Sequence, residues 1–214
     1  MASGWFWWIT CAGFTRFAGY ATRCSSIRRG RGPVVKLIAK PPLETGLLFE
    51  AGGARLLAVD TGRLTSIAPY AGQADAVSQV LLSEHGLVFP APGRVSHSEA
   101  ARCVWWGRAQ AMLAGPEPAA GLGACAALTD QSDGWAMLVL EGAGARAVLS
   151  RLTPLDIRAR VFPAGHTART ELAHMMASVT CAGPDRFELL VMRSMAQTAW
   201  HALETAVKSI AAQG

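Results

Sequence analysis

The segment from Leu152 to Met175 holds the densest group of side chains in this sequence that could do chemistry. Carboxylates and histidines are the groups that most often move protons in enzymes, and arginine binds carboxylates and phosphates through a planar set of N–H donors. The composition therefore permits proton transfer or docking of a partner protein. The residues concerned are Asp156, His166, Arg169, Glu171, His174 and Met175.

Two proline turns must shape the backbone of this segment. Pro154 pushes the residue before it out of the helical region, so that a preceding helix must end there. A second turn is predicted at 162–165, where a glycine can take a positive φ. We therefore expect an ordered loop, with a short helical or extended piece at 167–173, in which Asp156 pairs with Arg169.

Candidate metal ligands are too widely spaced to indicate a site. Cys103, Cys125 and Cys181 lie far apart, no Cys-x-x-Cys occurs, and His166 and His174 are eight positions apart. Zinc sites usually take their ligands in closely spaced pairs. We therefore expect no metal site, and buried, reduced cysteines in a cytoplasmic protein.

A glycine pair, Gly142-Ala-Gly144, follows an apolar run and precedes a helical pattern, as in a dinucleotide-binding turn. The third glycine of that fingerprint is replaced by Ala147, so we expect these glycines only to allow a tight helix start. No hydroxyl in this region stands in a Gly-x-Ser-x-Gly setting, and no nucleophile–base pair is predicted. The hydroxyls considered are those of Ser150, Thr170, Ser178 and Ser194.

The charge of the chain lies at its N-terminus. Of the net charge of +5, all comes from the first 33 residues, which contain five arginines and no acidic residue. Residues 34–214 carry equal numbers of basic and acidic residues, which argues against a nucleic-acid-binding surface. The hydrophobic share of 51% against 16% charged residues suggests a large face that a partner subunit covers.

Residues 1–33 do not fit a standard targeting signal. An aromatic cluster, Trp5–Trp8, precedes the arginines, whereas a secretory signal has the reverse order. We favour a misassigned start, with the true chain beginning at Val34 or Val35; a targeting segment and an anchor are the alternatives. We expect no packed structure in 1–33 and one domain over 34–214, without a membrane span.

Short apolar runs separated by turn residues alternate with helical patterns along the rest of the chain. Hairpin connections imply antiparallel sheet, so we expect an α+β fold in which hairpins alternate with helices on one side of the sheet. We predict strands at 55–59, 102–106 and 109–113, a loop at 60–72, and hairpins at 125–129/135–140 and 175–181/186–193. We predict helices at 75–85 (stopped by Gly86), 142–152 and 194–211 (capped by Ser194).

The pattern Leu152-Thr-Pro-Leu-Asp156, followed by Phe162-Pro-Ala-Gly-His-Thr-Ala-Arg-Thr-Glu-Leu-Ala-His-Met175, resembles the gamma subunit of heterotetrameric sarcosine oxidase. The resemblance covers about 35–211 and is strongest over 124–208. One departure is His166, where that family often has a small residue. The resemblance implies a fold like the folate-binding domain of the glycine-cleavage T-protein.

The resemblance also implies a function. Sarcosine oxidase demethylates sarcosine oxidatively to glycine, producing hydrogen peroxide and either formaldehyde or methylenetetrahydrofolate. In that family the flavins (FAD and FMN) belong to the beta subunit, NAD and tetrahydrofolate to alpha, and zinc to delta. The gamma subunit would then be structural and cytoplasmic, packing mainly against alpha, with no nucleic acid or membrane partner.

A candidate subunit-contact loop follows from the composition of the segment. Arginine and methionine are enriched at protein interfaces, so we expect an exposed docking loop there. Two alternatives remain open: a free-standing folate-binding one-carbon-transfer protein, whose pterin would need a carboxylate, and an adaptor subunit of another flavin amine oxidase. The predicted contact residues are Asp156, Arg169, Glu171, His174 and Met175.

Overall fold

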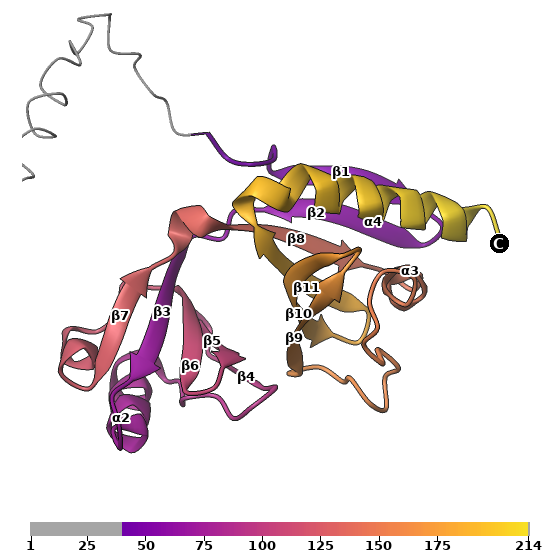
Figure 1. Cartoon of the computed structure of the whole chain (residues 1–214). Helices are drawn as coiled ribbons and strands as arrows, with labels where there is room; N and C mark the ends of the chain where they lie inside the picture. Colours follow the sequence, from indigo (N-terminus) through magenta and orange to yellow (C-terminus); the bar gives the residue numbers. More distant parts are fainter. Residues whose placement is uncertain (1–39, 214) are drawn as a thin grey trace, which may run out of the picture. The chain divides into compact units, whose positions relative to one another are not determined.

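Strands from both halves of the sequence form two antiparallel sheets in the computed structural model, which describes residues 40–213 (Figure 1). Sheet A has the order β1-β2-β8-β11-β10-β9 and sheet B the order β4-β5-β6-β3-β7. Every strand pair is antiparallel, which confirms the predicted α+β fold class. The predicted extension at 1–33 lies outside the described residues.

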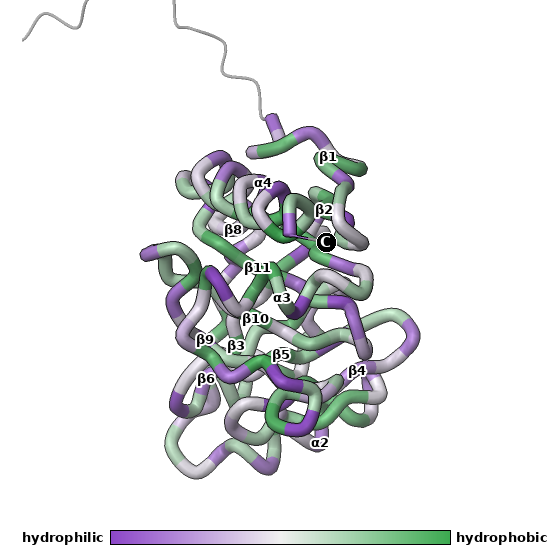
Figure 2. Tube along the Cα trace, turned by 90° about the vertical axis from the view of Figure 1, so that its right-hand side faces the viewer, coloured by the Kyte–Doolittle hydropathy of each residue, from purple (hydrophilic) through white to green (hydrophobic). Residues whose placement is uncertain are grey.

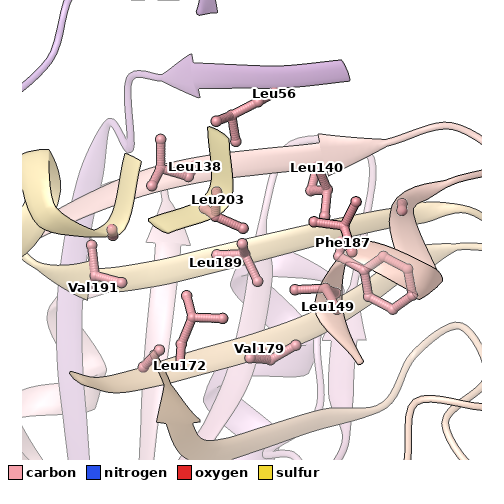
Figure 3. Packing of buried hydrophobic residues seen from close by; sticks show 14 of the residues in the cluster. Leu56, Leu138, Leu140, Leu149, Leu172, Val179, Phe187, Leu189, Val191 and Leu203 are labelled. Atoms are coloured by element: carbon pink, nitrogen blue, oxygen red, sulfur yellow. The ribbon is translucent and has the colours of Figure 1, made fainter. Parts of the chain in front are cut away.

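Sheet A carries its helices on one face. The helix α4 (Ala196–Ala211) places Ala199, Leu203 and Val207 at a helical spacing, and all three are fully buried. The short helix α3 (Ala145–Leu149) packs beside it, and together they cover the main hydrophobic core (Figure 3). The strands of this sheet are β1 (Gly46–Ala51), β2 (Ala54–Val59), β8 (Trp135–Glu141), β9 (Thr167–Leu172), β10 (Met175–Gly183) and β11 (Arg186–Met192).

The central strands of sheet A are apolar on both faces. Figure 2 shows hydrophobic stretches along β8 and β11, which pair with each other in the middle of the sheet. One face of these strands meets the helices, and the other meets sheet B through a separate cluster around Met112, Met137 and Leu190. Burial on both faces explains why these strands appear in the sequence as continuous apolar runs instead of an alternating pattern.

Sheet B has its own helix and its own core. The helix α2 (Ala74–His85) buries Val77 and Leu81 against the sheet and ends at Gly86, whose φ of 65° lies in the left-handed region. The predicted helix and its glycine stop are therefore confirmed. The strands are β3 (Arg63–Pro69), β4 (Val95–His97), β5 (Arg102–Gly107), β6 (Gln110–Gly115) and β7 (Ala126–Asp130), with 3-10 turns η1 (Ala120–Ala124) and η2 (Ser132–Gly134).

The prediction of a loop at 60–72 is wrong, because this stretch contains β3, a central strand of sheet B. Four successive residues of β3 are buried, including Thr65 and Ser66, so no alternation marks it. The buried hydroxyl of Ser66 accepts a hydrogen bond from Gln110 Nε2 on β6 (2.8 Å). The hydroxyl of Ser66 is thus satisfied inside the sheet, whereas that of Thr65 is buried without a partner among the described residues.

The predicted hairpin at 125–129/135–140 is also wrong. The turn between these strands is real, since Asp130 accepts hydrogen bonds from the amide and hydroxyl of Ser132 (2.9 and 2.6 Å). However, β7 pairs with β3 in sheet B, whereas β8 pairs with β2 and β11 in sheet A. The turn therefore passes the chain from one sheet to the other, and each sheet has its own helical cover.

Two helix boundaries differ from the predictions. The helix predicted at 142–152 is limited to the five residues of α3. Ser194 does not cap the last helix: it lies in the 3-10 turn η3 (Arg193–Met195), and the N-cap position of α4 is Met195, without a side-chain hydrogen bond. The hairpin predicted over 175–193 is confirmed as β10 and β11.

No helix within residues 40–213 combines the length and the hydrophobicity that a membrane span requires.

Candidate functional site

The loop that follows α3 is held by one arginine, Arg146. Its Nε and Nη2 atoms donate to the carbonyl oxygen of Pro184 (3.1 and 2.7 Å), and its Nη1 donates to the carbonyls of Ile157 and Phe162. The guanidinium also lies 4.9 Å from the ring centroid of Phe187. Sequence reasoning missed this residue, although a charged side chain in an otherwise apolar helix is a usable signal.

Asp156 forms a local pair and does not reach Arg169. Its carboxylate accepts from Arg158 Nε (2.8 and 3.0 Å) and from the Arg158 amide (3.1 Å). Hydrogen bonds from Arg158 lower the pKa of Asp156 to about 2. The predicted Asp156–Arg169 pair is therefore wrong, and the carboxylate stabilises the turn in which it lies.

The backbone at the start of β9 joins the two sheets. On one side, the amide of Gly165 donates to the carbonyl of Cys181 on β10 (2.9 Å). On the other side, the amide of Val95 donates to the carbonyl of Gly165 (3.0 Å), and the amide of Thr167 donates to the carbonyl of Gly93 (3.0 Å). Within the segment from Leu152 to Met175, which we call the signature segment, residues 165–167 thus form a seam between sheet A and the start of β4 in sheet B.

His166, the departure from the family pattern, fits into this seam. Its backbone pairs with Arg94 in an isolated antiparallel bridge. Its ring Nδ1 lies 3.0 Å from the carbonyl oxygen of Pro163, and the ring centroid lies 5.8 Å from that of Phe162. The larger side chain is therefore accommodated by contacts within its own turn.

Arg169 connects the sheets through aromatic side chains. Its guanidinium lies 4.2 Å from the ring centroid of Trp106 on β5 and 5.5 Å from that of Trp135 on β8. The two tryptophan rings meet edge to face at 4.7 Å. Burial lowers the pKa of Arg169, and its Nε is buried without a hydrogen-bond partner among the described residues.

The remaining predicted contact residues lie at the turn between β9 and β10. His174, with a φ of 68°, points into solvent, and its Nδ1 lies 2.7 Å from a carboxylate oxygen of Glu171. Met175 is only 5% exposed and belongs to the main core, so it is not part of an exposed loop. Its neighbour Met176 is 55% exposed instead. The five predicted residues therefore do not form one continuous exposed loop.

The backbone of Gly52 and Gly53 occupies the space beside the Gly142-Ala-Gly144 turn. A Cβ at Gly142 would lie 2.2 Å from the carbonyl oxygen of Gly53, and one at Gly144 would lie 2.6 Å from that of Gly52. The amide of Gly144 donates to the carbonyl of Gly53 (3.1 Å). A dinucleotide turn keeps this space and these amides for a pyrophosphate, so the residues here do not fit that cofactor.

Possible metal ligands elsewhere in residues 40–213 are dispersed. In this part of the chain, no three His, Cys, Asp or Glu side chains gather closely enough to hold a metal ion. Cys103, Cys125 and Cys181 are free and buried, and burial raises the pKa of Cys103 to about 12. An open pocket of about 330 Å³ is lined by Thr61, 97–102, Ala114 and Gly115, and neither predicted carboxylate takes part in it.

The sequence and the fold are similar to those of known proteins. Residues 110–209 match the model of the sarcosine oxidase, gamma subunit family. A chain of heterotetrameric sarcosine oxidase from Corynebacterium sp. U-96, in complex with pyrrole 2-carboxylate, is similar in structure with a TM-score of 0.67 and 22% identity; the similarity covers 77% of this chain and 89% of that chain. Glycine cleavage system aminomethyltransferase T from Bartonella henselae has a TM-score of 0.49 and 14% identity over 71% of this chain and 45% of that chain. No curated protein matches the sequence.

The match and the fold agree with the pattern of the signature segment, which lies inside the matched residues. Residues 110–209, slightly less than half of the chain, are therefore similar to the sarcosine oxidase gamma subunit family.

Proposed function

We propose that this chain is the gamma subunit of a four-subunit sarcosine oxidase and that its role in the complex is structural. The complex oxidises sarcosine to glycine and produces hydrogen peroxide, with formaldehyde or methylenetetrahydrofolate as the one-carbon product. The partners are the alpha, beta and delta subunits, with alpha in the most direct contact, in the cytoplasm. FAD, FMN, NAD, tetrahydrofolate and zinc are held by these other subunits.

The observation that carries the structural role is that the signature segment uses its polar groups within the fold. Asp156 is paired with Arg158, Glu171 with His174, and Arg169 is stacked on two tryptophans. A general acid or base must instead reach a proton on the substrate. These contacts support a segment that fixes the shape of the subunit.

Kinetic measurements on the assembled complex test this role. We expect the Asp156→Asn and Glu171→Gln variants to assemble normally and to keep kcat and KM for sarcosine within about twofold of the unaltered complex, because a change in protein charge far from the reacting atoms has little effect on the barrier. A loss of kcat by about 100-fold in a complex of normal composition would contradict the structural role and assign a catalytic group to this chain.

Assembly and ligand binding test the other parts of the proposal. Expressed alone, the chain should be poorly soluble, and co-expression with alpha should correct this. A soluble monomer without affinity for alpha would contradict the assignment of alpha as the main partner. Equilibrium binding of tetrahydrofolate to the isolated chain separates this proposal from a free-standing folate-binding protein, since micromolar affinity would overturn the non-catalytic role.

A further inference from the structure

The face of sheet A that meets sheet B is covered over only part of its area. In one row across the sheet, Met137 pairs with Leu190, and both are buried at 3% and 7% exposure. In the next row on the same face, Trp135 pairs with Met192, which is 53% exposed. The cover from sheet B therefore reaches Trp135, which contacts Trp106 of β5, but it does not reach Met192.

A second methionine extends this uncovered row. Ala177 of β10 pairs with Val191 of β11, and the two strands are antiparallel. Met176, one residue before Ala177, therefore lies beside Met192, one residue after Val191. Met176 is 55% exposed. We call Met176 and Met192, with the partly buried Trp135 beside them, the methionine row.

Arg169 borders the methionine row and has no acceptor for its N–H groups among residues 40–213. The ring of Trp135 belongs both to the row and to the stack on which the guanidinium lies, with centroids 5.5 Å from Arg169 and 4.7 Å from Trp106. The guanidinium lies over the ring of Trp106, and its Nε is fully buried without a hydrogen-bond partner among the described residues. Burial lowers the pKa of Arg169, which shows that keeping this guanidinium charged has a cost here.

A partly buried cation without a counter-ion is costly, and a carboxylate is the group that best offsets this cost. Two parallel N–H donors of a guanidinium match the two oxygens of Asp or Glu, and the aromatic stack already fixes the orientation of the donors. Glu171, two positions along β9 from Arg169, lies opposite Met176 in the sheet, and its carboxylate is 2.7 Å from Nδ1 of His174. The adjoining thioether side chains favour an apolar protein surface over a small hydrated anion.

We propose that the methionine row and Arg169 form the docking surface for another subunit of the sarcosine oxidase complex, which places one Asp or Glu carboxylate against Arg169 and apolar side chains on Met176 and Met192. This inference rests on the proposed function, and it replaces the exposed loop expected from the sequence. Arginine, tryptophan and methionine at the centre of a partly desolvated patch are typical of interface hot spots.

The test uses the full chain, co-expressed with the other three subunits. Each variant replaces one methionine of the surface by a charged residue. Met176→Glu and Met192→Glu place a carboxylate in the apolar part of the surface and next to the incoming carboxylate. We expect each to weaken binding to the remaining subunits by about tenfold or more, while the urea midpoint of the chain is unchanged. The matched control is Leu82→Glu on α2, at a side chain that is 58% exposed and far from the methionine row in sequence. The affinity of this variant for the remaining subunits should stay within about twofold of that of the unaltered chain.

Two further variants identify the occupant. Arg169→Lys keeps the charge but not the planar donors, and it should weaken binding by about tenfold in the complex. A photocrosslinking residue at position 176 should capture a peptide of another subunit that contains Asp or Glu. Crosslinks only to a second copy, or only to residues 1–39 of the same chain, would overturn the assignment of the occupant.

The outcomes separate this inference from the proposed function. If the unaltered chain does not enter the complex, the proposed function fails. If the unaltered chain enters normally and both methionine variants enter with equal affinity, only the docking surface is overturned. If Leu82→Glu abolishes assembly while Met176→Glu does not, the surface lies on sheet B and the inference is wrong.

Discussion

Replacing Arg146 by methionine tests whether a single guanidinium holds the loop after α3. Methionine retains the unbranched apolar stem and can fill the same space, but it removes every donor to the carbonyls of Pro184, Ile157 and Phe162. The Arg146 side chain is only 19% exposed, so water replaces these donors incompletely.

The magnitude follows from these contacts. A hydrogen bond from a charged donor contributes about 1.5 kcal/mol or more, which gives about 3 kcal/mol for the carbonyls of Pro184 and Ile157. The stack on Phe187 adds about 1 kcal/mol, whereas the ion pair with Asp185, at 3.9 Å and on an exposed partner, adds little. Apolar packing of the new methionine offsets about 1 kcal/mol. We therefore expect a loss of about 3 kcal/mol in the free energy of unfolding.

A urea titration followed by tryptophan fluorescence measures this loss. With a typical m-value, the midpoint should fall by about 1 to 2 M, and trypsin should cleave the native protein faster at Arg160 in the same loop. The control is Arg158→Met in the same loop, whose midpoint should fall much less, because the pair of Arg158 with Asp156 is exposed to solvent. If Arg146→Met keeps the midpoint and the cleavage rate of the unaltered protein, the guanidinium does not hold the loop.

Three further predictions concern single residues. Gly142→Ala should destabilise the chain by about 2 kcal/mol more than Gly46→Ala, because both glycines have a φ above 100° but only the first Cβ would meet a backbone oxygen, at 2.2 Å; equal urea midpoints would refute this. Carboxyl NMR should show Asp156 titrating at about 2, so the stabilisation from its pair is complete above the ordinary pKa of about 4 and is lost as the pH falls toward 2. Arg158→Met should return this pKa toward its usual value, and a titration near 4 in the unaltered protein would contradict the pairing. Burial that raises the pKa of Cys103 to about 12 should protect it from thiol reagents at pH 8 until urea unfolds the chain, which peptide mass mapping detects.

The local elements of the fold could be predicted where the signal was local. The helix α2 has an apolar stripe and a glycine stop, and the β10–β11 hairpin has a turn between two apolar runs. The strand β3 could not be recognised, because burial on both faces removes the alternation and two of its buried residues, Thr65 and Ser66, are polar. The turn at 130–134 was recognised, but no local signal states whether the next strand pairs with the previous one or joins another sheet.

In the candidate site, too, local backbone turns could be predicted from the sequence, whereas contacts between distant residues could not. The proline and glycine turns of the signature segment fixed an ordered loop, and the structure contains it. The partners of its charged residues could not be predicted, since Arg169 stacks on Trp106 of a distant strand, while Asp156 uses an arginine two positions away. Met175 and Met176 are indistinguishable by composition, and only the register of β10 decides which one is buried.

All five strands of sheet B lie between β2 and β8 in the sequence, although β2 and β8 are neighbours in sheet A, with Val59 opposite Met137. As the chain leaves the ribosome, β1 and β2 therefore emerge first. The edge of β2 that pairs with β8 stays unpaired until all of sheet B and then β8 have been synthesised. Sheet B and α2 can fold in that interval, because their strands are contiguous in the sequence. The β1–β2 hairpin is consequently the part of a nascent chain most open to wrong pairing, and a chaperone or an early-arriving subunit would protect the molecule most by covering that edge.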